Sequence, residues 1–277
     1  MPAARHTTAP DFPWWLAIAA TAALGIAALI VANDLYAQIF AIIAKGVAIT
    51  IFVTVVGFAL AAAIGLGIAL MALSQSLFMR QAARLYVEII RGVPILVLLF
   101  WIAFAGVPAV VAGWNALTAP LQQAGYLGEL LVRDVSLLWR AILALTIGYS
   151  AFISEIFRAG ILSVEIGQIE AAKALGLSRG QRFRLVVFPQ AIRTILPPLG
   201  NDFVAMVKDS SLVSVLGVAD ITQMGKVYAA GTFRFFETYS IVAYVYLILT
   251  VGLSLALRAL EKRLRRRHSA GGAAQSA

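Results

Sequence analysis

Two groups of charged and polar side chains interrupt long apolar runs of this sequence. Glu155 is the first, and Lys208, Asp209, Ser210 and Ser211 form the second. Charged side chains are costly within a bilayer, and those found there usually mark a functional site. A carboxylate can accept hydrogen bonds from an ammonium group, while a lysine and hydroxyls can donate to a carboxylate. These side chains therefore indicate a site for a polar solute.

Each group also has a purely structural interpretation. Arg158 follows Glu155 at i,i+3 spacing and could form an ion pair with it near the membrane interface. Lys208 could pair with Asp209 or with Asp202 and so stabilise a broken helix. The sequence leaves these interpretations open beside the binding hypothesis.

The residue pattern does not support metal binding, nucleophilic catalysis or ATP binding. The sequence has no cysteine, and its two histidines, His6 and His268, lie in polar tails. It therefore offers no metal-ligand spacing and no nucleophile–histidine pair. It also lacks the G-x-x-x-x-G-K-S/T phosphate loop. We expect no catalytic residue, no metal site, no cofactor and no enzymatic activity in this chain.

The composition indicates a membrane protein. Hydrophobic residues make up 61% of the 277 positions and charged residues only 13%, whereas soluble domains contain about 25% charged residues. The formal net charge of +9 could indicate nucleic acid, but membrane proteins concentrate arginine and lysine on the cytoplasmic side. We therefore predict an all-α, polytopic helical membrane protein and no nucleic-acid partner.

Six apolar runs are long enough to cross a bilayer. These are residues 14–32, 43–73, 94–111, 138–161, 191–216 and 238–257. The first run is longer than the apolar core of a signal peptide, and only Arg5 supplies a basic charge of the kind that precedes such a core, so we expect a retained span. We divide the chain into an N-terminal tail with an extra span (1–40), a transmembrane domain (41–260) and a basic tail (261–277).

Three segments are more polar than the rest of the transmembrane domain. Residues 74–88 are predicted to form a loop, and residues 112–137 a helix on the outer face. The run 191–216 contains Pro197-Pro198 and Asn201-Asp202. Such polarity favours a broken or protein-buried helix that lines a cavity.

A polar, basic stretch, residues 165–198, separates two of the apolar runs. Its first part places Ile169, Ala172 and Leu175 on one side at helical spacing. Gly176 can end this helix in the left-handed conformation. The pattern predicts a short helix that stops at a glycine.

A second short helix is predicted directly after that glycine. Ser178 and Gln181 have the spacing of a capping box. The helix spans residues 179–187, and we expect it to end at Pro189. The two helices would form a corner, which the pattern alone does not distinguish from an ordinary surface helix pair.

The spacing within this corner carries a family resemblance. Glu170-Ala171-Ala172 is followed by Gly176 four positions later, and an apolar segment ends at Pro189. This arrangement resembles the EAA loop of permease subunits in bacterial ATP-binding-cassette (ABC) importers, with Val186 and Phe188 in place of Ile and Leu. Arg91-Gly92-Val93-Pro94 resembles the Arg-Gly-Thr-Pro segment of the polar-amino-acid (histidine/glutamate/glutamine-type) subfamily of these permeases, with Val93 in place of Thr.

The resemblance implies a transmembrane permease subunit of an ATP-driven, binding-protein-dependent importer, with ATP hydrolysis on a separate subunit. The implied partners are cytoplasmic ABC ATPase subunits, an extracytoplasmic solute-binding protein, a second permease subunit (identical or related), membrane lipid and a polar amino acid. Glu170, Ala171, Ala172 and Gly176 would couple this chain to the ATPase.

The ionisable groups within the spans would then bind the amino acid. Glu155 or Asp209 would hold its ammonium group. Lys208, with the hydroxyls of Ser210 and Ser211, would hold its carboxylate.

Basic residues predict the orientation of the chain in a bacterial inner membrane. Arg80 and Arg84, the corner around Glu170 and the C-terminal basic tail fall on one side of the six predicted spans. By the positive-inside rule this side is cytoplasmic, and so are both termini. Two other classes remain open: an ATPase-independent secondary transporter or channel, and a membrane-anchored assembly or signalling protein.

Overall fold

The structure is a computed structural model, and it describes residues 14–273. Within that range the chain is helical and contains no strand. The α-helices are α1 (Trp14–Ala32), α2 (Asp34–Ala44), α3 (Val47–Ala72), α4 (Leu77–Gly92), α5 (Ile95–Trp101), α6 (Val107–Gln123), α7 (Leu137–Leu162), α8 (Ile166–Ala174), α9 (Arg179–Arg182), α10 (Phe188–Asp209), α11 (Ile221–Thr232) and α12 (Phe235–Ala273). Short π-helical turns are η1 (Ile102–Gly106) and η3 (Phe183–Val187), and short 3₁₀ turns are η2 (Val132–Asp134) and η4 (Ser210–Leu216).

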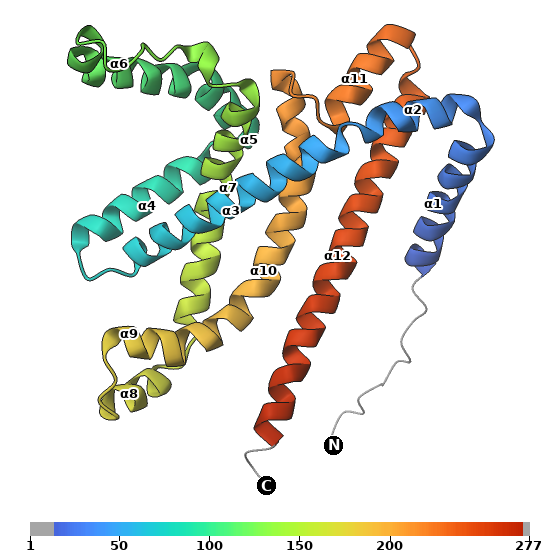
Figure 1. Cartoon of the computed structure of the whole chain (residues 1–277). Helices are drawn as coiled ribbons and strands as arrows, with labels where there is room; N and C mark the ends of the chain where they lie inside the picture. The colour runs from blue at the N-terminus through green and yellow to red at the C-terminus, as the bar shows by residue number, and fades with distance from the viewer. Residues whose placement is uncertain (1–13, 274–277) are drawn as a thin grey trace.

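The helices form a bundle in which α7 is the central element, in contact with α3, α4, α5 and α10. The helices α2 and α3 follow one another in a tilted line across the bundle (Figure 1). One end of the molecule carries α6 and α11, and the opposite end carries α8 and α9 (Figure 1). The last helix, α12, runs from the end with α11 toward the end with α8 and α9 (Figure 1).

Four helical stretches of the described residues are long and apolar enough to cross a membrane. They are Asp34–Ala72, Ile95–Gln123, Leu137–Leu162 and Phe235–Leu260. They take the places of the predicted second, third, fourth and sixth spans. The predicted first span is α1, whose apolar part is shorter, and the predicted fifth is α10, which is more polar. The prediction of an all-α, polytopic membrane fold is confirmed.

Close packing between α3 and α7 holds the bundle together. A methyl group placed on Gly65 of α3 would lie 3.0 Å from the carbonyl oxygen of Ser150 on α7. The side chains of Ile142, Leu145 and Ile153 on α7 are fully buried in the same core. Small residues permit such approach between helices in lipid, where no hydrophobic force drives association.

Residues 74–88, which we predicted to form a loop, are mostly helical. The helix α4 begins at Leu77, and its residues Ala83 and Val87 form a buried cluster with Ile68 of α3. The charged side chains of Arg84 and Glu88 are exposed. The prediction was wrong because the average polarity of this segment conceals a narrow apolar face.

The second short helix of the corner does not end at Pro189. The helix α9 continues through η3 into α10, so that helical structure extends to Asp209. Pro189 lies in the first turn of α10, directly after the π-helical turn has changed the backbone hydrogen-bonding pattern. The missing N–H of proline is therefore tolerated here and does not stop the chain.

The break predicted in the fifth apolar run lies later than its prolines. Pro197 and Pro198 are inside α10, which continues past them. The helix gives way to the 3₁₀ turn η4 at Ser210, and η4 ends at Gly217 in the left-handed conformation, with φ of 80°. The prolines remove backbone donors, but packing of α10 against α7 and α12 preserves the helix around them.

A buried arginine organises the end of the bundle near α6. The helix predicted for residues 112–137 is present only as far as Gln123, the end of α6. The remainder folds back to α7, where the Arg140 side chain donates to three carbonyl oxygens: that of Val135 at 2.8 Å, that of Ala103 at 3.1 Å, and that of Val132. Only 8% of Arg140 is exposed.

A second buried polar group fixes α11 to its neighbours. Asp220, which has no exposed surface, caps α11 by accepting from the backbone N–H of Gln223 at 2.8 Å, and it also accepts from the Tyr246 hydroxyl of α12 at 3.1 Å. Burial raises the pKa of the Asp220 carboxyl, and these hydrogen bonds oppose that rise. Gly46 leaves room for the Asp220 backbone, which would lie 2.4 Å from an added methyl group.

The terminal segments are described only in part. The N-terminal tail, residues 1–13, and the last four residues, 274–277, lie outside the described residues. The backbone of the basic tail continues α12 as helix to Ala273. The division of the chain at residues 40 and 260 stays a prediction.

Candidate transport cavity and coupling corner

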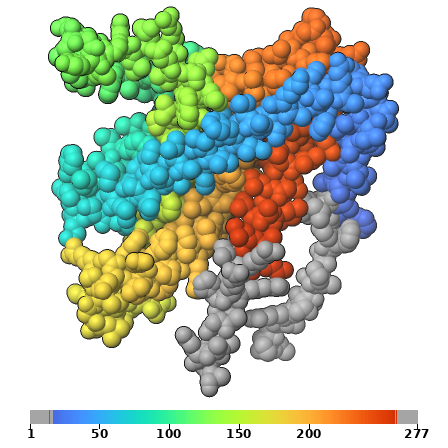
Figure 2. Space-filling view, viewed as in Figure 1, coloured from blue at the N-terminus to red at the C-terminus, as the bar shows by residue number. Residues whose placement is uncertain are grey.

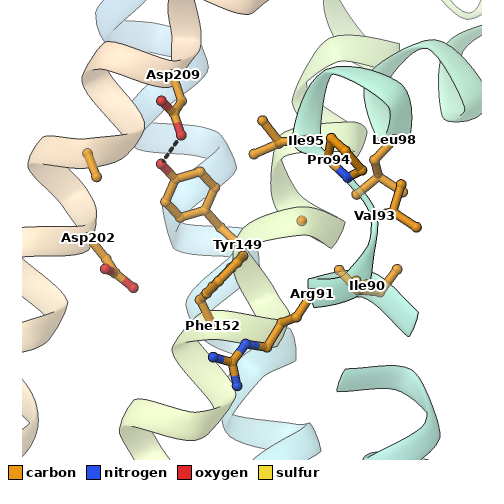
Figure 3. A pocket seen from close by; sticks show the side chains of 13 residues that line it. Ile90, Arg91, Val93, Pro94, Ile95, Leu98, Tyr149, Phe152, Asp202 and Asp209 are labelled. Carbon is orange, nitrogen blue, oxygen red and sulfur yellow. Dashed lines mark hydrogen bonds between the residues drawn. The ribbon is translucent and has the colours of Figure 1, made fainter. Parts of the chain in front are cut away.

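A cavity of about 530 Å³ lies between the α4–α5 junction, α7 and α10. Most of its lining is apolar, and Val93, Ile95 and Leu98 belong to this part (Figure 3). A few polar groups interrupt that lining and come from three different elements. Such a pattern is typical of a small-molecule site, in which few polar groups set the orientation of the ligand.

The cavity wall formed by α10 carries two carboxylates. Asp209 accepts a hydrogen bond from the Tyr149 hydroxyl of α7, with 2.7 Å between the oxygen atoms. The Oδ2 atom of Asp202 is buried and has no hydrogen-bond partner in the described part of the chain. Because a buried carboxylate oxygen without a donor is unfavourable, Asp202 is suited to accept from a ligand.

The opposite side of the cavity supplies a cation. Arg91, near the end of α4, places its guanidinium carbon 5.3 Å from the centroid of the Phe152 ring on α7. It forms no ion pair with any described residue. In Figure 3 the side chains of Arg91, Phe152, Tyr149 and Asp209 follow one another through the cavity. The cavity thus has one basic and one acidic end.

The structure separates the predicted substrate-binding residues. Of those five, all within the described range, only Asp209 lines the cavity. The Lys208 side chain is exposed, and it pairs with neither of the acidic residues that we considered as its partners. The Ser210 hydroxyl donates to its own helix, to the carbonyl oxygen of Val207 at 2.7 Å, and Ser211 makes no side-chain hydrogen bond with a described residue.

Glu155 forms the ion pair with Arg158 that we considered as the alternative to substrate binding. Its carboxylate receives three hydrogen bonds from the Arg158 guanidinium, of which the shortest is 2.7 Å. Both side chains are about one-third exposed, at 33% for Glu155 and 38% for Arg158. The pair lies in the C-terminal part of α7 and does not line the cavity.

Three residues of the cavity were missed by sequence reasoning. Arg91 and Asp202 did stand out as charges beside apolar runs, but we interpreted them as a helix start and as a possible ion-pair partner. Tyr149 gives no signal in the sequence, because an aromatic residue in a span is ordinary. Its role depends on a contact between α7 and α10 that spacing along the chain does not reveal.

The predicted corner is present at the end of the bundle opposite α6. Gly176 ends α8 with φ of 77°, the left-handed conformation that we expected. Ser178 and Gln181 form the expected capping box, with the Ser178 N–H donating to the Gln181 amide oxygen at 2.9 Å. The sequence therefore identified the local geometry of the corner correctly.

One face of α8 anchors the corner to the bundle. Ala172 is buried, and Ile169 packs on a cluster that includes Val187 and Ile195. Leu175, which we assigned to the same face, is 81% exposed. It follows the last residue of α8.

The remaining predicted coupling residues face outward. Glu170 and Ala171 are exposed, and Glu170 forms no ion pair with a described residue. They are therefore accessible to a partner.

A bundle of membrane-length helices that surrounds a charged cavity and carries an exposed helical corner defines a membrane transport protein. Residues 62–266 match the family described as "Binding-protein-dependent transport system inner membrane component". The chain belongs to this family. It is accordingly a multi-pass inner membrane protein and a permease subunit, not an ATPase-independent secondary transporter or channel.

Individual relatives agree with this membership. The chain is 34% identical over 225 residues to the "Probable amino-acid permease protein YxeN" of Bacillus subtilis (strain 168), covering 81% of this chain and 92% of that protein. It is 36% identical over 221 residues to the "Glutamine transport system permease protein GlnP" of Escherichia coli (strain K12), covering 80% of this chain and 92% of that protein.

A solved structure of similar sequence has the same fold. It is described as "Crystal structure of an amino acid ABC transporter with histidines" and is 35% identical to this chain, with a TM-score of 0.67. The match covers 84% of this chain and 98% of that one.

Proposed function

We propose that this chain forms the translocation pathway of an ATP-driven importer for a polar amino acid. The support is its similarity to permeases named for glutamine and amino acids, over most of both chains, and to an amino acid ABC transporter. The single observation that carries the substrate class is the charge arrangement of the cavity, where Arg91 and the carboxylates of Asp202 and Asp209 line one mostly apolar cavity.

That arrangement suits a zwitterion. The unpaired oxygen of Asp202 accepts from the ammonium group, and the guanidinium of Arg91 donates to the carboxylate. Asp209, the predicted residue that lines the cavity, orients the Tyr149 hydroxyl through its hydrogen bond. Glu155, Lys208, Ser210 and Ser211 were also predicted to bind substrate, but none of them lines the cavity.

Hydrolysis of ATP takes place on a separate cytoplasmic subunit in this proposal. The chain has no phosphate loop, and its corner offers an exposed surface for such a partner. Glu170 and Ala171 contact the ATPase, Ala172 anchors α8 to the bundle, and Gly176 sets the bend between α8 and α9. An extracytoplasmic solute-binding protein and a second permease subunit complete the importer.

The proposed orientation places the corner in the cytoplasm. Lys173, Arg179, Arg182 and Arg184 give the corner a positive charge, which the positive-inside rule assigns to the cytoplasmic side. The helix α12 runs to the same end, so the C-terminus is also cytoplasmic (Figure 1). An even number of spans returns the N-terminus to that side.

The test is ATPase activity of the complete importer in lipid, with and without binding protein and substrate. We expect Glu170→Arg to abolish stimulation by the loaded binding protein, because the exposed carboxylate that contacts the ATPase is replaced by a cation. Glu165→Arg makes the same charge change at the exposed start of α8, and we expect it to retain most of the stimulation. Full stimulation of the Glu170→Arg importer would remove the corner from the coupling mechanism.

A further inference from the structure

A second pocket, of about 780 Å³, lies between the inner end of α3 and the corner. One wall contains Leu73 and Ser74, where α3 ends, and the other is formed by α8, α9 and η3. In Figure 2 the corner (yellow) lies directly below the turn between α3 and α4 (cyan), and the surface between them is hollowed. The cavity between α7 and α10 is separate from this pocket and shares no lining residue with it.

The charge of this pocket is wholly positive. Lys173, Arg179 and Arg182 line it, and no acidic side chain does. None of the three forms an ion pair within the range that the structure describes. The Nε atom of Arg182 is buried and has no hydrogen-bond partner there. A buried donor without an acceptor is unfavourable, and three cations without ion-pair partners line this pocket, so an anion suits it.

An arginine lies beside the C-terminal end of α3. The last carbonyl groups of a helix carry partial negative charge and would repel an anion. Here the Arg80 side chain donates to the carbonyl oxygens of Ser74 and Gln75, at 3.0 Å and 2.8 Å. These two carbonyl groups belong to the turn that follows α3, so the Arg80 cation lies beside the helix end and offsets part of its negative charge.

Apolar side chains line the same pocket beside the cations. Leu70 and Leu73 come from α3, and Phe183 comes from η3. A free phosphate ion has no apolar part to contact them, whereas the glycerol and upper acyl chain of a phospholipid do. The pocket also lies where the α3 span ends, at the depth of the lipid headgroups.

We propose that this pocket binds a phosphate-bearing anion, the headgroup of an anionic phospholipid in the inner leaflet. The inference rests on the proposed function only for the cytoplasmic position of the corner. Anionic lipids of that leaflet attract basic segments close to the membrane. The bound headgroup contacts both the corner and the end of α3, so it restrains the element that couples transport to the ATPase.

The test is lipid binding by the full-length permease alone, purified in a neutral detergent. Fluorescent phosphatidylglycerol and phosphatidylcholine are titrated against wild type and against a variant carrying Lys173→Gln, Arg179→Gln and Arg182→Gln. Each cation near an anionic surface contributes about fivefold to affinity. We expect wild type to prefer phosphatidylglycerol and the variant to lose at least tenfold in phosphatidylglycerol affinity, with phosphatidylcholine unchanged.

A charge-matched control separates the pocket from the general positive charge of the protein. Arg84→Gln, Arg184→Gln and Arg193→Gln together remove the same charge from exposed positions that do not line the pocket. We expect this control to bind phosphatidylglycerol within twofold of wild type. Equal losses in the two triple variants would overturn the proposal, as would equal affinity of wild type for the two lipids.

Two further arms identify the source of the anion and guard against misfolding. Displacement of phosphatidylglycerol by millimolar inorganic phosphate would overturn the lipid assignment in favour of a soluble phosphate. Lys173→Gln alone changes an exposed side chain of α8. We expect this variant to bind phosphatidylglycerol about fivefold more weakly than wild type, and it provides the test if the triple variant does not fold. Binding needs neither ATPase nor substrate, so a failure here leaves the Glu170→Arg result to decide the proposed function.

Discussion

The body of the molecule around α7 and the corner at the end opposite α6 (Figure 1) are held by different interactions. In the body, Ile142, Leu145 and Ile153 are fully buried, and Gly65 brings α3 against the α7 backbone. In the corner most side chains are exposed, and a few apolar contacts such as Ala172 attach it to the bundle. The body is packed around a cavity, whereas the corner leaves most of its surface accessible.

This contrast has energetic consequences that substitutions can measure. A substitution in the body must displace packed neighbours or leave buried polar groups without partners. A substitution in the corner changes a surface. Stability should therefore respond to the first kind, and coupling to the second.

The largest loss of stability is expected from Arg140→Met. The substitution retains apolar volume but removes the Arg140 donor from the carbonyl oxygens of Val135 and Ala103. It also removes one of the two donors to the Val132 carbonyl oxygen, which keeps the backbone N–H of Val135. We expect the free energy of unfolding to fall by about 3 kcal/mol, because the three hydrogen bonds are buried or partly buried and involve a charged donor. Unfolding of the purified permease by denaturant in mixed micelles measures it. Arg133→Met, at an exposed site nearby, should change stability by less than about 0.5 kcal/mol.

The next largest effect concerns substrate binding. Asp202→Asn retains the size of the side chain but removes the charge from the unpaired cavity oxygen. A hydrogen bond to a charged group contributes about 1.5–3 kcal/mol, so KM for amino acid uptake into proteoliposomes should rise between about tenfold and a hundredfold. ATPase activity without substrate should not change, since the corner is intact. An unchanged KM would place the substrate elsewhere.

A pair of glycine substitutions compares the two regions directly. Gly65→Ala would place a methyl group 3.0 Å from Ser150 O and 3.1 Å from Ser154 N on α7, and we expect a loss of about 1–3 kcal/mol. Gly167→Ala in α8 would meet no atom within 4 Å and should stabilise that helix by up to about 1 kcal/mol. Equal destabilisation by both would contradict the contrast between body and corner.

The smallest effect on stability is expected from the ion pair between Glu155 and Arg158 in α7. The Glu155–Arg158 ion pair is about one-third exposed, and pairs of this kind contribute up to about 1 kcal/mol. Glu155→Gln should therefore destabilise the permease by less than about 1 kcal/mol and leave the KM for uptake within twofold. A tenfold rise in KM would restore Glu155 as a substrate-binding residue. Arg158→Gln removes the other charge of the same ion pair, and we expect the same small loss of stability.

Local features of this chain were predictable from its sequence, whereas contacts between helices were not. Gly176 and the Ser178–Gln181 capping box depend on neighbours along the chain, and both were predicted correctly. The helix α4 was missed because its apolar face is narrow. Helix continuation through Pro189 was missed because it depends on the packing of α10.

The candidate site was predictable only in its chemistry. Carboxylates near Asp209 stood out because charge is rare in a span. Which of these charges share a cavity depends on how α4, α7 and α10 are placed relative to one another. That placement brings Arg91 and Asp202 together and leaves Lys208 on the exposed surface.

The uninterrupted helical path from α9 through η3 to α10 determines how force travels through the molecule. A flexible loop at Pro189 would absorb a displacement of the corner, but a continuous helical rod, bent between α9 and α10 (Figure 1) and about 45 Å long along its path at about 1.5 Å per residue, can transmit it. The rod is most compliant at Pro197 and Pro198, where backbone hydrogen bonds are missing. These prolines lie just before Asp202, in the part of α10 that leads into the cavity, so any bending there would alter the width of the cavity.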